Sequence, residues 1–535
     1  MSISSKSIQD GFWENYNIQD KDIEFLFNHL IEVEEPLSPN ELLLALVSNI
    51  IQEEKKRIEK QQQSNGVIYL PNKQYKLNEP VVFPGLDWKV GTVKNIRAGI
   101  NPDLPPFEVI EVELEDGLQK SFAAGYNDHP LNQSNNSLLD DPSINPEIVV
   151  ESFGQILNPR LINALEHNKD LVRIAGKWFP CTLLVDVNIG YLNLAEALLD
   201  MADGGPLSTK QILEQIELPT DVNQKLTIFS LNHALQEDER FDEVGSTGHI
   251  LWYLNKLEPS SVNAMPSYLK HEKKDIDYLS IEEMLKLFDN QVLDELENDE
   301  YLPQNCINPD EEIAINLIFP HWRSGTLPCC KSIKHVFPKA FESNRILFKF
   351  IDQDNQSEFN GWVVRDHNYI YGLEEYYSSN GLIPGSIVYL KKGKNEGEVL
   401  LRINKRKPGR DWIKTVSINS NGSISFTMLK QMVSSSYDER MAYFIPEINV
   451  LDDYWQGINK FKFSKDQAVL STMLELAKLN PQGHVHAQEL YAALNIIKRC
   501  PPGLVLDTLN RSDKVSYLGD LYFRINENKI QDEHE

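Results

Sequence analysis

The chain has 535 residues, of which 41% are hydrophobic and 24% charged, and its formal net charge is −27. This length and composition are typical of a globular protein with roughly three to five domains, and they exclude a largely disordered chain. No apolar run approaches the roughly 18 residues of a membrane-spanning helix, the first residues lack the pattern of a secretory signal, and five scattered cysteines fit a reducing compartment, so we expect a cytoplasmic protein without membrane contact.

The charge is distributed unevenly along the sequence. Residues 275–312 contain thirteen acidic residues and one basic residue, a net charge of −12. Residues 331–415 carry a net charge of +5, and residues 460–525 carry +3. A chain this acidic is not expected to coat DNA over its whole surface, because phosphates would be repelled. The two basic regions remain candidates for phosphate contact.

Residues 1–64 are predicted to form a helical N-terminal unit. Apolar residues recur with helical spacing from Ile23 to Ile31, and Ser38 with Glu41 has the pattern of a capping box for a further helix. In residues 65–132, short β-branched segments alternate with glycine and proline, and Asp116-Gly117 predicts a hairpin turn. Five short strands predict a small β-barrel. Their arrangement resembles the Tudor-like barrels of transcription and chromatin proteins.

Residues 147–258 are predicted to form an acidic winged-helix domain. Two helices are separated by Gly204-Gly205-Pro206, and a third helix precedes two strands joined by a glycine-rich turn. Residues 193–258 hold twelve acidic and four basic residues, so this copy is expected to bind protein, since phosphate would be repelled. Residues 259–312 are predicted to be an acidic helical linker. One hypothesis is that this linker folds back on the basic run described below and competes with DNA.

Residues 313–450 are predicted to form a β-rich domain. The order is a strand, a strand with Trp362, a short helix with Tyr376 and Tyr377, and a tight turn at Gly385 before a further strand. Glycine suits that turn because it tolerates a positive φ. The order is similar to the DNA-binding pseudobarrels of plant transcription factors and of some restriction-enzyme effector domains.

Residues 460–527 repeat the order of three helices and a two-stranded wing, which predicts a C-terminal winged-helix domain. Both copies end with a polar turn, a glycine and an aromatic strand, in residues 238–254 and 511–525. They resemble the HARE-type winged helix, a module similar in the bacterial RNA polymerase delta subunit and in some chromatin regulators. The resemblance implies a role in transcription or DNA transactions. The expected fold class is α+β multi-domain, with winged-helix domains combined with small β-barrel domains.

Basic residues of the C-terminal half are the candidate DNA contacts. The run 391–414 has a net charge of +6. We expect its two loops to present cations from one rim. The nearby Tyr389 and Trp412 either stack on bases or pack within the fold. Four more cations are expected around the third helix and wing turn of the C-terminal winged helix. A solubilising charge run is the alternative interpretation. The candidate nucleic-acid-binding residues are Lys391, Lys392, Lys394, Arg402, Lys405, Arg406, Lys407, Arg410, Lys498, Arg499, Arg511 and Lys514.

The sequence contains no familiar catalytic motif. It lacks the phosphate-binding loop, the HExxH zinc motif and the GxSxG nucleophile elbow. His484 and His486 are expected to be structural, because no second ligand pair is spaced for zinc, and Cys329-Cys330 has no nearby base. We therefore expect no enzymatic activity, no metal and no cofactor. A nuclease site of dispersed acidic residues and lysine would leave no motif and stays open.

The sequence favours a non-enzymatic DNA-associated protein that acts in transcription or its regulation. In this interpretation the pseudobarrel and the last winged helix hold DNA, and the acidic winged helix recruits a protein such as RNA polymerase. Two alternatives stay open. One is an accessory or specificity subunit of a defence or DNA-modification complex, and the other is a protein-interaction scaffold without nucleic-acid contact.

Overall fold

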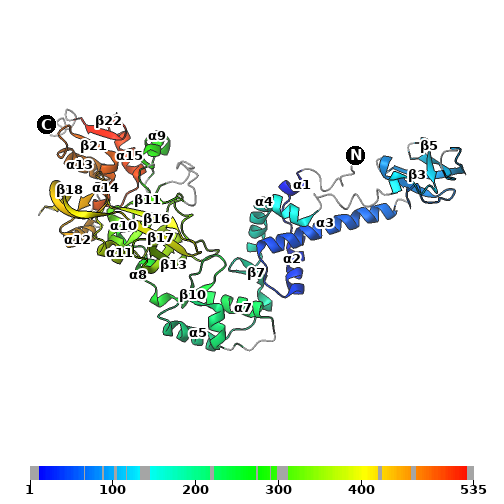
Figure 1. Cartoon of the computed structure of the whole chain (residues 1–535), viewed down its shortest axis with the longest axis horizontal. Coiled ribbons are helices and arrows are strands. Elements are labelled where there is room, and N and C mark those ends of the chain that lie inside the picture. Colours follow the sequence, from blue (N-terminus) through cyan, green and yellow to red (C-terminus); the bar gives the residue numbers. More distant parts are fainter. Residues whose placement is uncertain are drawn as a thin grey trace. The chain divides into compact units, whose positions relative to one another are not determined.

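The computed structural model describes residues 11–64, 67–86, 89–101, 105–115, 117–132, 145–216, 218, 222–272, 275–289, 291–297, 311–419, 424–458 and 465–526. Contacts divide the chain into two compact units (Figure 1). The first unit comprises Met1–Asp186 and Pro219–Ser230, and the second comprises Val187–Leu218 and Leu231–Glu535. The chain is mixed α+β, as the sequence predicts. No helix within the described ranges is both long and apolar enough to cross a membrane.

The helical part of the first unit has one apolar core. Ser38 caps α3 as predicted: its backbone N–H donates to Glu41 Oε2 at 2.7 Å, and the Glu41 N–H lies 3.4 Å from Ser38 Oγ. The predicted domain 147–258 is divided, because α4 packs its apolar face, including Leu157 and Leu161, against this N-terminal core. The elements are α1 (Phe12–Asn15), α2 (Asp20–Val33), α3 (Pro39–Ser64), α4 (Pro146–Glu166), β6 (Leu171–Ile174) and β7 (Lys177–Pro180).

The predicted five short strands are present in the first unit. They pair in sequential order, and their alternate residues, such as Ile110 and Val112, form a small separate core. The last two strands pair antiparallel as expected, although Asp116 of the predicted turn lies outside the described residues. Closure of this sheet into a barrel stays a prediction. The strands are β1 (Val67–Ile68), β2 (Pro80–Phe83), β3 (Lys89–Ala98), β4 (Glu108–Leu114) and β5 (Gln119–Ala124).

The second unit begins with an acidic helical subdomain, formed by its residues 189–216 and 231–254. The helices and strands occur in the predicted order, and the boundary between the units falls within α7. The Trp252 indole N–H donates to Thr209 and Asn232 in its core. The elements are α5 (Ile189–Met201), β8 (Leu207–Ser208), α6 (Thr209–Ile216), α7 (Gln224–Gln236), β9 (Phe241–Glu243) and β10 (Leu251–Leu254).

A curled half-barrel sheet of seven strands follows, in the order β11-β16-β17-β13-β14-β15-β12. Gly385 precedes β16 with φ +93°, and a Cβ there would lie 2.5 Å from Ala442 Cα, which confirms the predicted need for glycine. The elements are β11 (Ile313–Asn316), α10 (Phe319–Ser324), β12 (Thr326–Pro328), β13 (Arg345–Asp352), β14 (Glu358–Val364), β15 (Tyr369–Tyr371), α11 (Glu374–Ser379), β16 (Ile387–Lys392) and β17 (Glu398–Ile403).

Two long strands leave the half-barrel and form a separate three-stranded sheet with the order β19-β18-β20. β18 (Lys405–Ile418) pairs antiparallel with β19 (Ile424–Ser435), and they are the yellow strands beside α13 in Figure 1. β20 is Tyr443–Phe444, and α12 (Ile448–Ile458) follows. Val416 and Phe426, near the far end of the pair, are buried in the core shared with the C-terminal helices.

The C-terminal helical subdomain (residues 465–525) also has the predicted order of elements, and its sheet has the order β21-β23-β22. One core joins it to α9 (Tyr278–Asp289), α10, α12 and the β18–β19 pair. The predicted linker and C-terminal domain are therefore packed into a single body. The elements are α13 (Lys465–Ala477), β21 (His484–His486), α14 (Ala487–Ile497), α15 (Pro502–Arg511), β22 (Val515–Gly519) and β23 (Tyr522–Ile525).

Candidate nucleic-acid interface

The first group of predicted cations lies at the tip of the β16–β17 hairpin. Lys391 and Lys392 end β16, opposite the start of β17, and Lys394 follows in the loop. Lys392 and Lys394 are exposed, whereas Lys391 is half-buried. These side chains can meet phosphate without any rearrangement of the backbone.

The second group lies at the start of β18. Lys405, Arg406, Lys407 and Arg410 are all exposed. Lys405 pairs with Ser435 and Gly409 with Val433, so the residues between them form a bulge opposite a single residue of β19. A bulge re-aims the side chains of its strand, and Pro408 is tolerated there because no ladder hydrogen bond is needed. The bulge therefore projects a short basic segment from the sheet.

The two groups do not share one rim. Lys392 pairs with Val399 at the start of β17, and Lys405 follows the end of that strand at Ile403. Four residues of strand span about 13 Å, so the groups lie beyond opposite ends of β17. The expectation of a common rim is corrected, because the hairpin tip and the β17–β18 connection point in opposite directions along the strand.

Several predicted cations already have acidic partners. Arg402 Nε donates to Glu312 at 3.0 Å, and its guanidinium lies 4.4 Å from the Tyr389 ring centroid. Arg406 lies 3.4 Å from Asp411, and Lys405 lies 3.6 Å from Asp354. These side chains are at least partly exposed, so such pairs contribute about 0–1 kcal/mol and can be exchanged for phosphate.

The sequence interpretation missed Lys430 of β19. This residue lies outside the basic run, but strand pairing places it directly opposite Trp412 of β18. Its ammonium nitrogen is 5.4 Å from the Trp412 ring centroid, and both side chains are exposed. The register of β18 and β19 would have been needed to find it, because only the register brings residues 412 and 430 together.

Lys414 belongs to the same run but is a structural residue. It is 7% exposed, lies 3.1 Å from Glu489 and donates to the carbonyls of Glu439 and Arg440. Burial lowers the pKa of Lys414, although Glu489 partly opposes that effect. This cation joins β18 to α14 and is not available to DNA.

The cations of the C-terminal helical subdomain form a weaker surface than predicted. Lys498 donates to Glu272 at 2.8 Å, and Arg511 pairs with Asp507 of its own helix at 2.8 Å. Lys514 is half-buried before β22. Among the described residues, none of these three cations contacts a cation of β18, so they do not form one basic patch with that strand.

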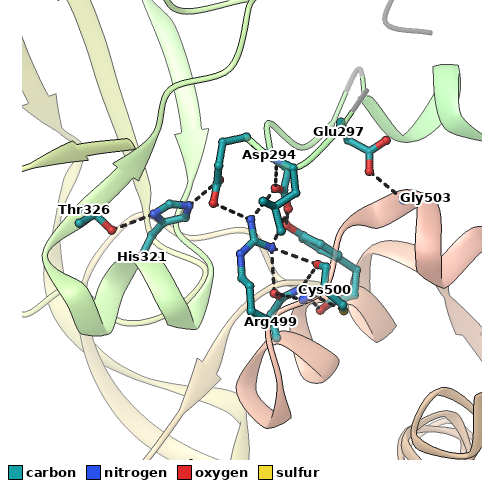
Figure 2. Close-up of polar contacts among 11 residues, drawn as sticks. Asp294, Glu297, His321, Thr326, Arg499, Cys500 and Gly503 are labelled. Carbon is teal, nitrogen blue, oxygen red and sulfur yellow. Dashed lines mark hydrogen bonds and ion pairs between the residues drawn. The ribbon is translucent and has the colours of Figure 1, made fainter. Parts of the chain in front are cut away.

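Arg499 is not a surface residue, which corrects its prediction as a DNA contact. Figure 2 shows its guanidinium among acidic and carbonyl groups, and its side chain is 0% exposed. It donates to Asp294 at 2.9 Å, to Glu295 at 2.9 Å and to the Cys500 carbonyl at 3.0 Å. A phosphate cannot reach it, because its side chain is buried and already pairs with Asp294 and Glu295 of the predicted linker.

The same network extends to a histidine. His321 Nε2 lies 2.8 Å from Glu295, and its Nδ1 lies 2.8 Å from Thr326 Oγ1 (Figure 2). Burial opposes ionisation of Glu295, but Arg499 and His321 outweigh it and hold the pKa of Glu295 well below its usual range. A hydroxyl, an imidazole and a carboxylate in a row are also the parts of a nucleophilic triad. Thr326 and His321 are 0% and 1% exposed, so substrate has no access and the network is structural.

The acidic linker therefore stabilises the fold. Asp294 and Glu295 ion-pair with Arg499, and Glu297 accepts a hydrogen bond from the Gly503 N–H at 2.8 Å. The hypothesis that the linker competes with DNA is corrected for these residues, since they bind the C-terminal helices. Glu312 retains that character with respect to the basic run, through its pair with Arg402.

The cysteine and histidine side chains that the sequence singled out have structural roles. Burial raises the pKa of Cys329 and Cys330 to about 12, so both are protonated thiols and poor nucleophiles at neutral pH. His486 Nδ1 accepts the Gln488 N–H at 3.2 Å and caps α14. Among the described residues, no group of three His, Cys, Asp or Glu side chains is placed to hold a metal ion.

Comparisons with protein-family models, curated proteins and solved structures gave no match to this chain.

Proposed function

We propose that this protein is a non-enzymatic DNA-associated protein acting in transcription or its regulation, and that DNA binds along β18 and β19. The observation that carries the proposal is the exposed group of Lys405, Arg406, Lys407 and Arg410 on β18, together with Lys430 on β19. These cations come from two paired strands, and Lys430 lies 5.4 Å from the exposed ring of Trp412. That combination is the chemistry of phosphate contact with base stacking.

The β16–β17 tip supplies a separate phosphate contact in this proposal. Lys392 and Lys394 extend the basic surface beyond the opposite end of β17 and would hold a DNA segment longer than the β18–β19 pair alone. Contacts of this kind position DNA without reading its sequence. The protein is therefore expected to bind DNA with strong salt dependence and little sequence preference.

We infer that the two helical subdomains are winged helices of the HARE type with different roles. The order of three helices and a short hairpin supports this inference in both copies. The acidic copy carries exposed apolar residues, Leu194 at 51% and Met201 at 85%, on the helix that also contains Glu196 and Asp200. An acidic surface with apolar groups suits a protein partner, with RNA polymerase as the candidate, and repels DNA.

The test is DNA binding by the full chain, measured as fluorescence anisotropy at several salt concentrations. A fragment that begins at residue 313 is unsuitable, because it lacks Asp294 and Glu295 and would leave Arg499 buried without its partners. We expect log K to fall linearly with log salt concentration, with a slope of about −0.9 per phosphate contacted on duplex DNA.

The test variant reverses three charges of the β18 group, and a single charge reversal outside the proposed surface serves as the control. Lys405→Glu/Arg406→Glu/Lys407→Glu should abolish most of the salt-dependent binding, whereas Lys210→Glu on α6 should leave it unchanged. Lys210 is exposed and lies in the acidic subdomain, outside the proposed surface. Equal losses in both variants, or no binding of wild type even at low salt, would contradict the proposal and favour a protein-interaction scaffold.

A further inference from the structure

One face of the β18–β19 pair is exposed over part of its length. Residues directly opposite each other in an antiparallel pair lie on the same side of the sheet, and the pairs here are Arg410 with Met432, Trp412 with Lys430, and Lys414 with Met428. Trp412 is 60% exposed, Met432 61% and Met428 39%. We name Arg410, Trp412, Met428, Lys430 and Met432 the Trp412 face.

The Trp412 face continues a buried apolar surface. Two residues further along the same side, Val416 and Phe426 are 3% and 4% exposed and pack in the core with the C-terminal helices. The side chains that cover this end of the sheet do not reach the Trp412 end. The aromatic ring of Trp412, with two methionines on the facing strand, is thus held on a pair of strands with most of its surface in water.

The charges on this face are all positive. Arg410 and Lys430 lie on either side of Trp412, and none of the opposed positions 410, 412, 414, 428, 430 and 432 is acidic. The one acid of β18, Asp411, alternates to the other side, where it accepts the Tyr437 hydroxyl at 2.9 Å. A ligand of this face should therefore combine a flat apolar group, which packs on Trp412, with negative charge close enough to reach Arg410 or Lys430.

A nucleotide has this chemistry, because each phosphate is one sugar away from an aromatic base. In a duplex the base faces are covered by neighbouring base pairs, whereas a single strand leaves them free to stack on aromatic side chains. The Lys430 ammonium, 5.4 Å from the Trp412 ring centroid, would move from the ring to the phosphate of a stacked base. The methionines add polarizable apolar contact at the edge of the base.

We propose that the Trp412 face binds an unpaired DNA strand, with a base stacked on Trp412 and the adjacent phosphates held by Arg410 and Lys430. This inference rests on the proposed function and deepens it. The basic bulge and the β16–β17 tip contact phosphate in any DNA form, while the Trp412 face selects single-stranded DNA. Its role would be to hold a strand where a duplex has been opened.

The test compares an oligothymidine strand with a duplex of the same length, using the full chain and Trp412→Ala. Stacking contributes through one base, so the variant should bind the single strand roughly 5- to 150-fold more weakly. Its salt slope should not change, because no charge is lost, and its affinity for duplex should stay at the wild-type value. Trp412→Phe should recover most of the loss, since it keeps a stacking ring.

Leu429→Ala is the matched control. Leu429 is 46% exposed on the same strand pair, but it pairs with Ile413 and lies on the opposite side from Trp412. The inference is overturned if Trp412→Ala binds the single strand as tightly as wild type, or if both variants lose the same affinity. Salt-dependent binding to duplex DNA would then still support the proposed function. Absence of salt-dependent binding to either DNA form by wild type would overturn both, and circular dichroism melting confirms that each variant is folded.

Discussion

Trp412 and Lys430 face each other across β18 and β19, with the Lys430 ammonium nitrogen 5.4 Å from the indole centroid. An exposed cation–π contact of this kind contributes about 0.5–1 kcal/mol. The fold therefore depends little on either side chain. The effect of substituting Trp412 or Lys430 on DNA binding can therefore be measured separately from its effect on stability. This is not true of the buried Lys414 on the same strand.

Removing single cations from the Trp412 face should lower the number of phosphates bound. Arg410→Ala and Lys430→Ala should each reduce the magnitude of the salt slope by about 0.7 on single-stranded DNA. Anisotropy titrations at several salt concentrations measure this slope. Lys478→Ala, which removes an exposed lysine just after α13, should leave the slope unchanged. A similar reduction in that control would contradict the assignment of the surface.

Glu312→Gln should strengthen DNA binding. Glu312 neutralises Arg402 next to the start of β18, so its replacement releases one guanidinium for phosphate and adds about 0.9 to the magnitude of the slope on duplex DNA. Glu475→Gln on α13, which releases Lys478 just after the helix in the same way, provides the comparison. If both variants bind as wild type does, Arg402 takes no part in the interface.

Arg499→Leu should destabilise the second unit severely. The change leaves the carboxylates of Asp294 and Glu295 buried without their cation, and breaking a buried pair costs about 3–5 kcal/mol. Chemical denaturation of the full chain measures the decrease in the free energy of unfolding, in the unfolding transition of the second unit. Lys498→Leu alters the neighbouring residue, whose pair with Glu272 is partly exposed, and should cost about 0–1 kcal/mol. A mild effect of Arg499→Leu would contradict the structural role assigned to the acidic linker.

Stability of the acidic helical subdomain should fall as the pH rises. Burial, with the carboxylates of Glu342 and Asp242 nearby, raises the pKa of Glu243 to about 8, against about 4.3 for an unfolded glutamate. The folded state then keeps a proton that the unfolded state has lost. Its contribution to stability is complete below about pH 4 and is lost as the pH rises to about 8, at up to about 1.4 kcal/mol per pH unit.

Glu243→Gln should remove the part of this pH dependence that Glu243 contributes. The amide stays neutral at every pH, so the unfolding midpoint between pH 5 and pH 8 should vary less than in wild type. Glu239→Gln makes the same change at an exposed position of the same segment and should leave the wild-type profile in place. An identical profile for wild type and Glu243→Gln would show that Glu243 is ionised in the folded protein across this range.

Local signals in the sequence predicted most elements of secondary structure. The capping pair Ser38 and Glu41, and the glycine turn at Gly385, were identified because each depends only on neighbouring residues. The same locality explains the errors in domain boundaries. Which core takes up α4, and whether α9 packs with the C-terminal helices, depends on contacts between residues far apart in the sequence.

The candidate interface was predicted only in part for the same reason. The run of positive charge at 391–414 identified Lys407 and Arg410. The separate search for cations in the C-terminal winged helix selected Arg499, which is buried, because sequence does not show that Asp294 and Glu295 pair with it. Lys430 was missed since only the register of β18 with β19 places it beside Trp412. The sign of charge is visible in sequence, whereas exposure and cross-strand neighbours follow from the fold.

Photochemical cross-linking tests most directly where DNA binds. A single strand containing 5-iododeoxyuridine forms covalent bonds with aromatic side chains that lie against the halogenated base, and mass spectrometry of the digested full chain identifies the attached peptide. The account predicts attachment at Trp412, lost in Trp412→Ala and retained in Leu429→Ala. Attachment confined to the acidic or the C-terminal helical subdomain, with none at residues 405–435, would contradict it.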